Sequence, residues 1–239
     1  MANGYYSEKN RKRIIYEQVK RHKQALRIKR IFIFSVLLLF AIFIFAFIVN
    51  KVISNNRGTK EVAEVGPVNV IEDFLDPNIY SRPQTPLKKV KGIVIHYTAN
   101  PGSDAIANRN YFNNLPSMNE GSEHPVYASS HYVIGLDGTI VQCIPLDEIS
   151  YASNDRNKDT ISIECCHPDE TGQFTDETYN SLIRLTAWLC GKYDVGKDDI
   201  IRHYDVTGKD CPRYYVKHKK KWDALKNDVI KYISENALQ

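Results

Sequence analysis

The sequence predicts a mixed α/β fold, in which one central β-sheet is flanked by helices and is preceded by one transmembrane helix. Short runs of β-branched apolar residues alternate with an amphipathic stretch over residues 176–193 in the C-terminal part of the chain. A long uncharged apolar run over residues 31–49 lies before them. The 239-residue chain is 43% hydrophobic and 25% charged, which is near the globular average and excludes wholesale disorder and a multispanning membrane protein.

Residues 31–49 predict a membrane-spanning helix, because Ser35 is their only polar side chain. These 19 residues extend about 28 Å as a helix, close to the hydrocarbon thickness of about 30 Å. A cleaved signal peptide is the alternative, but its apolar core typically has about 7 to 15 residues and ends at a small-residue site. Here Asn50 and Lys51 follow the run, so we expect an uncleaved signal anchor.

The basic charge of the chain is concentrated before this run. Residues 1–30 hold ten Lys or Arg and two Glu, a net charge of +8, and since the whole chain carries +4 the remainder is −4. The positive-inside rule therefore puts residues 1–30 in the cytoplasm and the rest of the chain outside the cell membrane. We interpret the basic segment as this topological determinant, which can also rest on anionic lipids, rather than as a site for a partner. No nucleic-acid partner is expected.

Residues 50–67 are polar and lack periodicity, so they predict a linker. Residues 68–239 are enough for one extracytoplasmic domain. Within it, the β-branched run at residues 92–95 predicts a buried strand. Ser103 in the N-cap position predicts a helix over residues 104–114.

The remaining elements complete the sheet and its helices. Asp137 and Gly138 predict a type I′ turn between strands over residues 130–136 and 139–144. Further along, the sequence predicts strands over residues 160–165 and 200–202 and amphipathic helices over residues 176–193 and 222–233.

Polar residues that suit metal binding follow two of these strands. His96 comes directly after residues 92–95, His203 follows residues 200–202, and Cys211 lies in the next loop. Two imidazoles and one thiolate are a natural ligand set for a catalytic Zn²⁺ that keeps one position for water. The pattern alone leaves other sets open, which combine His124, His131 and His167 with Cys165 or Cys166.

Four segments carry a resemblance to a known family: SRPQTPLKKVKGIVIHYTANPGS, SSHYVIGLDGTIVQCIP, DTISIECCHPDETGQF and RHYDVTGKDCPRYY. In this order they resemble the zinc-dependent N-acetylmuramoyl-L-alanine amidase family of type 2, which includes bacteriophage endolysins and is related to peptidoglycan recognition proteins. The resemblance covers residues from about 67 to the C-terminus. It implies a mixed sheet with helices on its faces. It also implies a hydrolase of peptidoglycan that cleaves the amide between the lactyl group of N-acetylmuramic acid and L-alanine of the stem peptide.

The resemblance also implies the roles of individual residues. The ligands of one Zn²⁺ per chain fall on His96, His203 and Cys211, the acidic residue of the family on Glu164, and its lysine on Lys209. The implied mechanism is that zinc supplies a hydroxide from water. Glu164 takes the proton and returns it to the L-alanine nitrogen, and the Lys209 ammonium stabilises the oxyanion. Some family members have a tyrosine where this sequence has Ser130, which assigns the proton transfer to Glu164.

Plainer interpretations stay open for several of these side chains. Glu164 could be a salt-bridge partner, Lys209 a solvated loop residue, and Cys211 half of a disulfide. His131 is either a hydrogen-bond donor behind a metal ligand or an ordinary core imidazole. His167 either touches substrate or is exposed on its loop. The number of cysteines is odd, which fits one metal-bound thiol, and Cys165 and Cys166 are expected to be free and partly buried.

Two other functions compete with the amidase. One is a peptidoglycan-binding receptor without turnover, which the presence of Cys211 disfavours. The other is a zinc peptidase that acts on stem peptides, because pocket shape decides which bond is cut. We expect a monomeric catalytic domain, held by the anchor and facing the cell wall, that serves in wall remodelling.

Overall fold

The computed structural model describes residues 62–238, together with scattered residues between positions 13 and 45. The chain divides into two compact units, Met1–Lys60 and Glu61–Gln239. Most of residues 1–30, most of the predicted span 31–49 and the first part of the predicted linker 50–67 lie outside the described residues. Five residues of the predicted span are described, and all are helical and exposed: Phe32, Phe40, Ile42, Ile44 and Phe45. In the described part of the chain, no helix has the length and apolar character that crossing a membrane requires.

The second unit is built on a six-stranded sheet with the order β1-β4-β3-β5-β2-β6. Strands β3 and β4 are antiparallel, and every other neighbouring pair is parallel. The strands are β1 (Ile71–Glu72), β2 (Gly92–Tyr97), β3 (Tyr132–Ile134), β4 (Ile140–Gln142), β5 (Thr160–Cys165) and β6 (Ile200–Arg202). This mixed central sheet confirms the predicted fold class of the domain.

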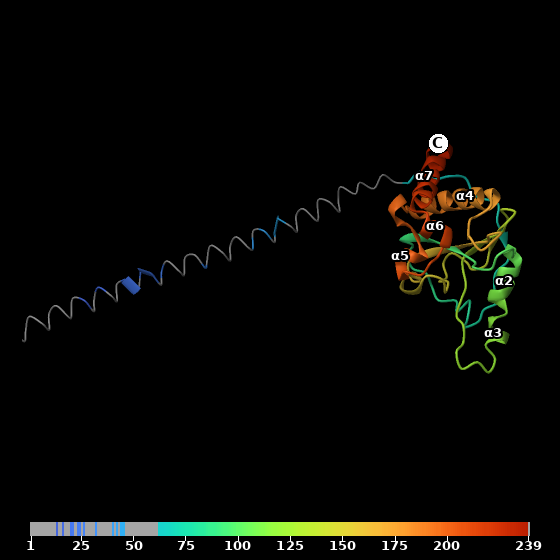
Figure 1. The fold of residues 1–239 in the computed structure, drawn as a ribbon, viewed down its shortest axis with the longest axis horizontal. Helices are drawn as coiled ribbons and strands as arrows, with labels where there is room; N and C mark the ends of the chain where they lie inside the picture. The colour runs from blue at the N-terminus through green and yellow to red at the C-terminus, as the bar shows by residue number, and fades with distance from the viewer. Residues whose placement is uncertain are drawn as a thin grey trace, which may run out of the picture. The chain divides into compact units, whose positions relative to one another are not determined.

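Helices cover both faces of the sheet, because its strands are apolar on both faces. On one face, α4 (Asp176–Tyr193) and α7 (Lys219–Asn236) pack against each other and against β2, β3 and β5 in one hydrophobic core. On the other face, α2 (Ala105–Asn113) packs on β3 and β4 and forms a second, smaller core (Figure 1). Short helical elements complete the domain: α3 (Leu115–Met118), η1 (Asn154–Arg156), η2 (Lys197–Asp199), α5 (His203–Thr207) and α6 (Arg213–Lys217).

Several helix and strand boundaries differ from the prediction, among them the end of β2 and the start of α2. Strand β2 continues to Tyr97, so His96 lies within the strand and not after it. The N-cap of α2 is Asp104, whose side chain accepts a hydrogen bond from the Ala107 N–H at 2.7 Å. The Ser103 hydroxyl instead donates to the Asn100 carbonyl at 2.7 Å. The sequence does not decide between the two residues, because either a serine or an aspartate can cap a helix and only the backbone geometry selects one.

The turn between β3 and β4 is not of type I′, which needs a positive φ at both central residues. Only Gly138 has one, at 81°. Its N–H donates to the Gly135 carbonyl at 3.1 Å, which closes a type I turn that ends in this glycine. Asp137 stabilises the turn, because its carboxylate accepts hydrogen bonds from the N–H and hydroxyl of Thr139.

The predicted boundary between linker and domain at residue 68 is wrong. Val65 is 6% exposed and belongs to the larger core. It pairs with Ala237 in an antiparallel bridge, and the Leu238 N–H donates to the Glu64 carbonyl at 2.8 Å. Residues 62–67 therefore belong to the domain. A single buried valine in a polar stretch has no periodicity by which the sequence could reveal it.

Candidate metal centre

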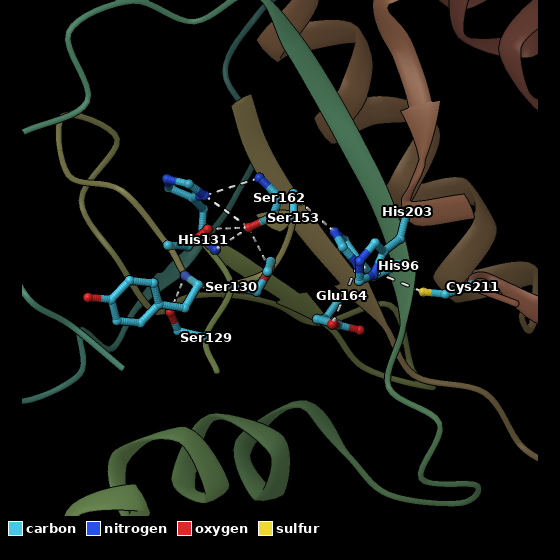
Figure 2. A network of polar contacts seen from close by, with 12 residues as sticks. His96, Ser129, Ser130, His131, Ser153, Ser162, Glu164, His203 and Cys211 are labelled. Atoms are coloured by element: carbon cyan, nitrogen blue, oxygen red, sulfur yellow. Dashed lines mark hydrogen bonds and ion pairs between the residues drawn. The ribbon is translucent and has the colours of Figure 1, made fainter. Parts of the chain in front are cut away.

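His96, His203 and Cys211 converge from three elements onto one point of the domain (Figure 2). Their possible ligand atoms all lie within 4.8 Å of one another. The Cys211 Sγ is 3.8 Å from His96 Nδ1, and the two imidazole centroids are 4.8 Å apart. The two histidines come together because β2 and β6 are parallel neighbours in the sheet. Ile95 lies opposite Arg202, and His96 and His203 are the residues that follow them.

The three side chains fit a zinc ion by their chemistry. They are 1%, 7% and 2% exposed, in the order His96, His203 and Cys211. Burial lowers the pKa of His96 well below its ordinary value, and the charges of His203 and Lys209 add to this; burial and Lys209 also lower the pKa of His203. Both imidazoles are therefore neutral and able to ligate a metal near neutral pH. Burial raises the pKa of the Cys211 thiol to about 12, and metal coordination deprotonates such a thiol.

Glu164 lies beside this group on β5. Its Oε1 is 4.0 Å from His96 Nδ1, its side chain is 17% exposed, and its Oε2 is buried with no hydrogen-bond partner among the described residues. Burial raises the pKa of Glu164 to about 8, and the positive charge of Lys209 partly opposes this rise. A carboxyl group with this pKa can hold or release a proton near neutrality.

A pocket of about 350 Å³ opens above these residues. The exposed Lys209 lines it together with His96, His203, Cys211 and Glu164. Aromatic side chains form much of the remaining wall: Tyr97, Phe112, Tyr127 and Tyr151. A larger hollow of about 1350 Å³ lies between residues 62–90 and the C-terminal end of α4, and it contains none of the predicted site residues. The smaller pocket is the better candidate for catalysis, because it joins ionisable groups with shifted pKa values.

Ser153 and Asn154 contact the two histidines, and the sequence alone indicated a role for neither of them. The Ser153 Oγ lies 3.1 Å from His96 Nε2, and the Asn154 Oδ1 lies 3.2 Å from His203 Nε2. They belong to a short polar stretch, SNDRN, that reads as an ordinary surface turn. Its composition holds no signal of contact with residues that lie far away in the chain.

His131 does not contact the three candidate ligands. Its Nδ1 accepts a hydrogen bond from the Ser162 N–H at 3.0 Å, and its Nε2 lies 3.0 Å from the Glu148 carbonyl oxygen. The side chain is fully buried, and burial lowers its pKa to about 4. In Figure 2 it lies apart from the candidate ligands, with Ser162 beside it. Of the two interpretations of His131, this geometry supports the ordinary core imidazole and not a hydrogen-bond donor to a metal ligand.

His167 is 1% exposed and is not part of the pocket wall. Its Nδ1 is 2.7 Å from the Asp169 carbonyl oxygen, and its ring packs on Tyr97 with centroids 5.0 Å apart. The expectation of an exposed loop histidine is wrong, and a direct substrate contact has no support in this geometry.

All five cysteines are free thiols: Cys143, Cys165, Cys166, Cys190 and Cys211. The open possibility of a disulfide at Cys211 is therefore not realised. Cys165 and Cys166 are free as expected, but they are fully buried rather than partly buried. They belong to the cores on opposite faces of the sheet.

Comparison with known proteins agrees with this architecture. The sequence pattern of the N-acetylmuramoyl-L-alanine amidase family matches residues 86–214. A probable N-acetylmuramoyl-L-alanine amidase from Bacillus licheniformis is 35% identical over 174 residues, which are 68% of this chain and 47% of that protein. The amidase BlyA from Bacillus subtilis (strain 168) is 34% identical over 178 residues, which are 65% of this chain and 45% of that protein.

The solved structures include a similar fold. The catalytic domain of XlyA superimposes with a TM-score of 0.56 at 25% sequence identity, over 68% of this chain and 99% of that domain. The chain spans about half the length of the curated relatives that it matches. Because the family pattern covers more than half of its residues, the chain belongs to the N-acetylmuramoyl-L-alanine amidase family.

Proposed function

We propose that this protein is a zinc-dependent amidase that cleaves peptidoglycan between the lactyl group of N-acetylmuramic acid and L-alanine of the stem peptide. One observation carries the proposal: two neutral imidazoles, a thiol and the carboxyl group of Glu164 meet in a single pocket of about 350 Å³. Family membership and the names of the relatives supply the substrate class.

His96, His203 and Cys211 are the residues that would hold the metal ion. Zinc, when bound, supplies a nucleophile from water at neutral pH and polarises the scissile carbonyl. The three side chains need no rearrangement of the fold to serve in this way, because they already converge in the buried floor of the pocket.

Glu164 is the proton carrier of the proposed reaction. Its carboxylate accepts the proton of the attacking water and returns it to the nitrogen of L-alanine as the amide bond breaks. The position of Glu164 supports this role, since one oxygen faces His96 and the other lacks a partner among the described residues. Its raised pKa, about 8, suits a group that both takes and gives a proton.

Lys209 supplies positive charge beside the reacting carbonyl. Its ammonium group influences His96, His203 and Glu164 through its charge, and it lines the same pocket. A cation in this place stabilises the oxyanion that forms when the carbonyl is attacked. The aromatic wall offers flat apolar surfaces against which a sugar ring or a peptide can pack.

The experiment that tests the function is product analysis on isolated muropeptides with the full-length protein. The expected products are free N-acetylmuramic acid sugars and intact stem peptides that begin with L-alanine. Shortened stem peptides would show a peptidase instead. Binding without any product would show a receptor, and either result would overturn the proposed activity.

We also propose that residues 31–49 anchor the protein in the cell membrane as a single span. The uncharged run and its basic N-terminal flank support this topology. Residues 1–30 are then cytoplasmic, and the catalytic unit faces the cell wall. The test is treatment of cells without their wall with an external protease, followed by carbonate extraction of the membranes. The catalytic unit should be digested, and the N-terminal segment should stay with the membrane; a protected catalytic unit would contradict the topology.

A further inference from the structure

A single turn contacts both histidines of the candidate metal centre. Ser153 and Asn154 are consecutive residues at the start of η1, and each reaches one imidazole. The Ser153 Oγ is 3.1 Å from His96 Nε2, and the Asn154 Oδ1 is 3.2 Å from His203 Nε2. His96 and His203 come from different elements of the fold, so this turn is a common support for two side chains that are distant in the sequence.

The contacts determine which ring nitrogen remains for a metal. Around His96, Nδ1 faces the Cys211 Sγ at 3.8 Å and the Glu164 Oε1 at 4.0 Å, whereas Nε2 faces Ser153. At His203, the amide oxygen of Asn154 can only accept a hydrogen bond, so Nε2 carries the hydrogen and Nδ1 keeps its lone pair. In both rings Nε2 therefore contacts the turn, and Nδ1 remains available to coordinate a metal.

The turn is itself held in place by Asn157. The Asn157 Oδ1 accepts hydrogen bonds from the N–H groups of Ser153 at 2.6 Å and Ala152 at 3.1 Å. The backbone N–H of Asn157 donates to the Asn154 carbonyl at 3.0 Å. Asn154 has a φ of 51°, a left-handed conformation that costs about 1 kcal/mol for a residue with a Cβ. Asn154 thus keeps a left-handed conformation at the position from which its side chain contacts His203.

We propose that Ser153 and Asn154 are positioning residues that orient His96 and His203 so that both Nδ1 atoms point at one zinc ion. This inference rests on the proposed zinc site of the preceding section. Hydrogen bonds to the outer nitrogen of a ligating histidine set its tautomer and its ring orientation, and their loss typically weakens metal binding about 10- to 100-fold.

The test compares the zinc affinity of full-length variants by competition with a chromophoric chelator. Asn154→Gly removes the amide and accepts the positive φ, and Asn154→Asp keeps an acceptor oxygen at the same place. Ser153→Ala removes the hydroxyl beside His96. Asp155→Ala is the matched control, because Asp155 is an exposed neighbour in the same turn for which the described part of the chain shows no side-chain hydrogen bond or ion pair.

We expect Asn154→Gly and Ser153→Ala to weaken zinc binding about 10- to 100-fold. Asn154→Asp and Asp155→Ala should bind zinc as tightly as the wild type. The metal-free Asn154→Gly protein should be at least as thermally stable as the wild type, because Asn154 is exposed and glycine adopts the positive φ without strain. The visible absorption bands of the Co²⁺-loaded protein should shift in Asn154→Gly and Ser153→Ala, since these bands report the geometry of the ligands.

Wild-type zinc affinity and an unchanged Co²⁺ spectrum in both Asn154→Gly and Ser153→Ala would overturn the positioning role. The same holds if Asn154→Asp loses as much affinity as Asn154→Gly, because the acceptor oxygen would then be irrelevant. A wild-type protein that binds no zinc would overturn the metal site itself, and this outcome separates failure of the proposed function from failure of the positioning role.

Discussion

Glu164 and His96 occupy the same register position on the parallel strands β5 and β2, and their side chains lie 4.0 Å apart. Paired residues on neighbouring strands are about 4.8 Å apart in the backbone and point to the same face of the sheet. The sheet itself therefore presents the candidate proton carrier and a candidate metal ligand to one pocket. Because Glu164 lies beside the candidate ligands and is not one of them, a mutation of Glu164 can test its role while the ligands stay in place.

Replacing Glu164 with glutamine should abolish most of the activity and leave metal binding intact. The amide keeps the shape of the side chain but cannot carry the proton, so we expect kcat to fall about 10²- to 10⁴-fold. The measurement is release of stem peptides from muropeptides, with zinc content determined on the same sample. Glu177→Gln, on the first turn of α4, is the control and should keep full activity. An unchanged rate in zinc-loaded Glu164→Gln would remove Glu164 from the chemistry.

Replacing Lys209 with methionine should slow the reaction without loss of zinc. The substitution keeps the length of the side chain and removes its charge, and loss of one oxyanion-stabilising group costs about 10²- to 10³-fold in kcat. Because Lys209 is exposed, the lower end of this range is expected. Steady-state kinetics on a soluble muropeptide provides the measurement, and Lys220→Met, in α7, serves as control. Equal kcat values in the two variants would show that Lys209 has no part in catalysis.

Removal of zinc should stop hydrolysis and lower the stability of the protein. A metal that binds only the folded state at a free concentration of about 100 times its Kd adds about 2.7 kcal/mol to the free energy of unfolding. We expect a chelator to abolish activity and lower the unfolding temperature, and added Zn²⁺ to restore both. Mg²⁺ should restore neither, because it prefers oxygen ligands. Full activity after complete removal of metal would refute the metal-dependent mechanism.

His131 should make the protein less stable as the pH falls from 6.5 to about 4. Its pKa is lowered by burial from 6.5 to about 4 in the folded state, so in this interval only the unfolded chain takes up the proton. The free energy of unfolding, measured with urea, should therefore decrease with falling pH below 6.5, and His131 should contribute no slope above it.

The variant His131→Asn isolates this effect, because it retains polar groups in the core but does not titrate. Its stability at pH 7 should be lower by about 1 to 3 kcal/mol, since a buried hydrogen bond is lost. Its pH dependence between 6.5 and 4 should be shallower than that of the wild type. His96 and His203 contribute equally to both proteins and cancel in the comparison. The exposed His124, replaced by asparagine, is the control; equal slopes in all three proteins would refute the prediction.

Gly138 should tolerate no side chain, because two constraints act on it together. Its φ is 81°, and a Cβ at this position would lie 2.9 Å from the Glu177 carbonyl oxygen on α4. Gly102 has a similar φ of 75° with no atom within 4 Å of such a Cβ. Gly102→Ala therefore measures the backbone strain alone, about 1 to 2 kcal/mol. Urea unfolding should show a larger loss for Gly138→Ala, and equal losses would mean that the contact with α4 relaxes freely.

The type of most elements and the identity of the converging residues could be predicted from the amino-acid sequence alone. The strand over residues 160–165 and the helix over residues 176–193 have the predicted bounds, because alternating and amphipathic apolar patterns report burial directly. His96, His203 and Cys211 could be selected since they belong to segments that resemble a known family. Their common location then follows from the order of parallel strands.

The environment of these residues could not be predicted from the sequence, because it depends on how distant elements pack. The pairing of Glu164 with His96 depends on strand register, and the contacts of Ser153 and Asn154 with the histidines depend on how a surface turn packs against β2 and α5. Val65 lies in the core through a bridge to Ala237 at the other end of the domain. Local periodicity records which face of an element is buried, but a polar side chain in a turn acquires its partner only when distant elements pack together.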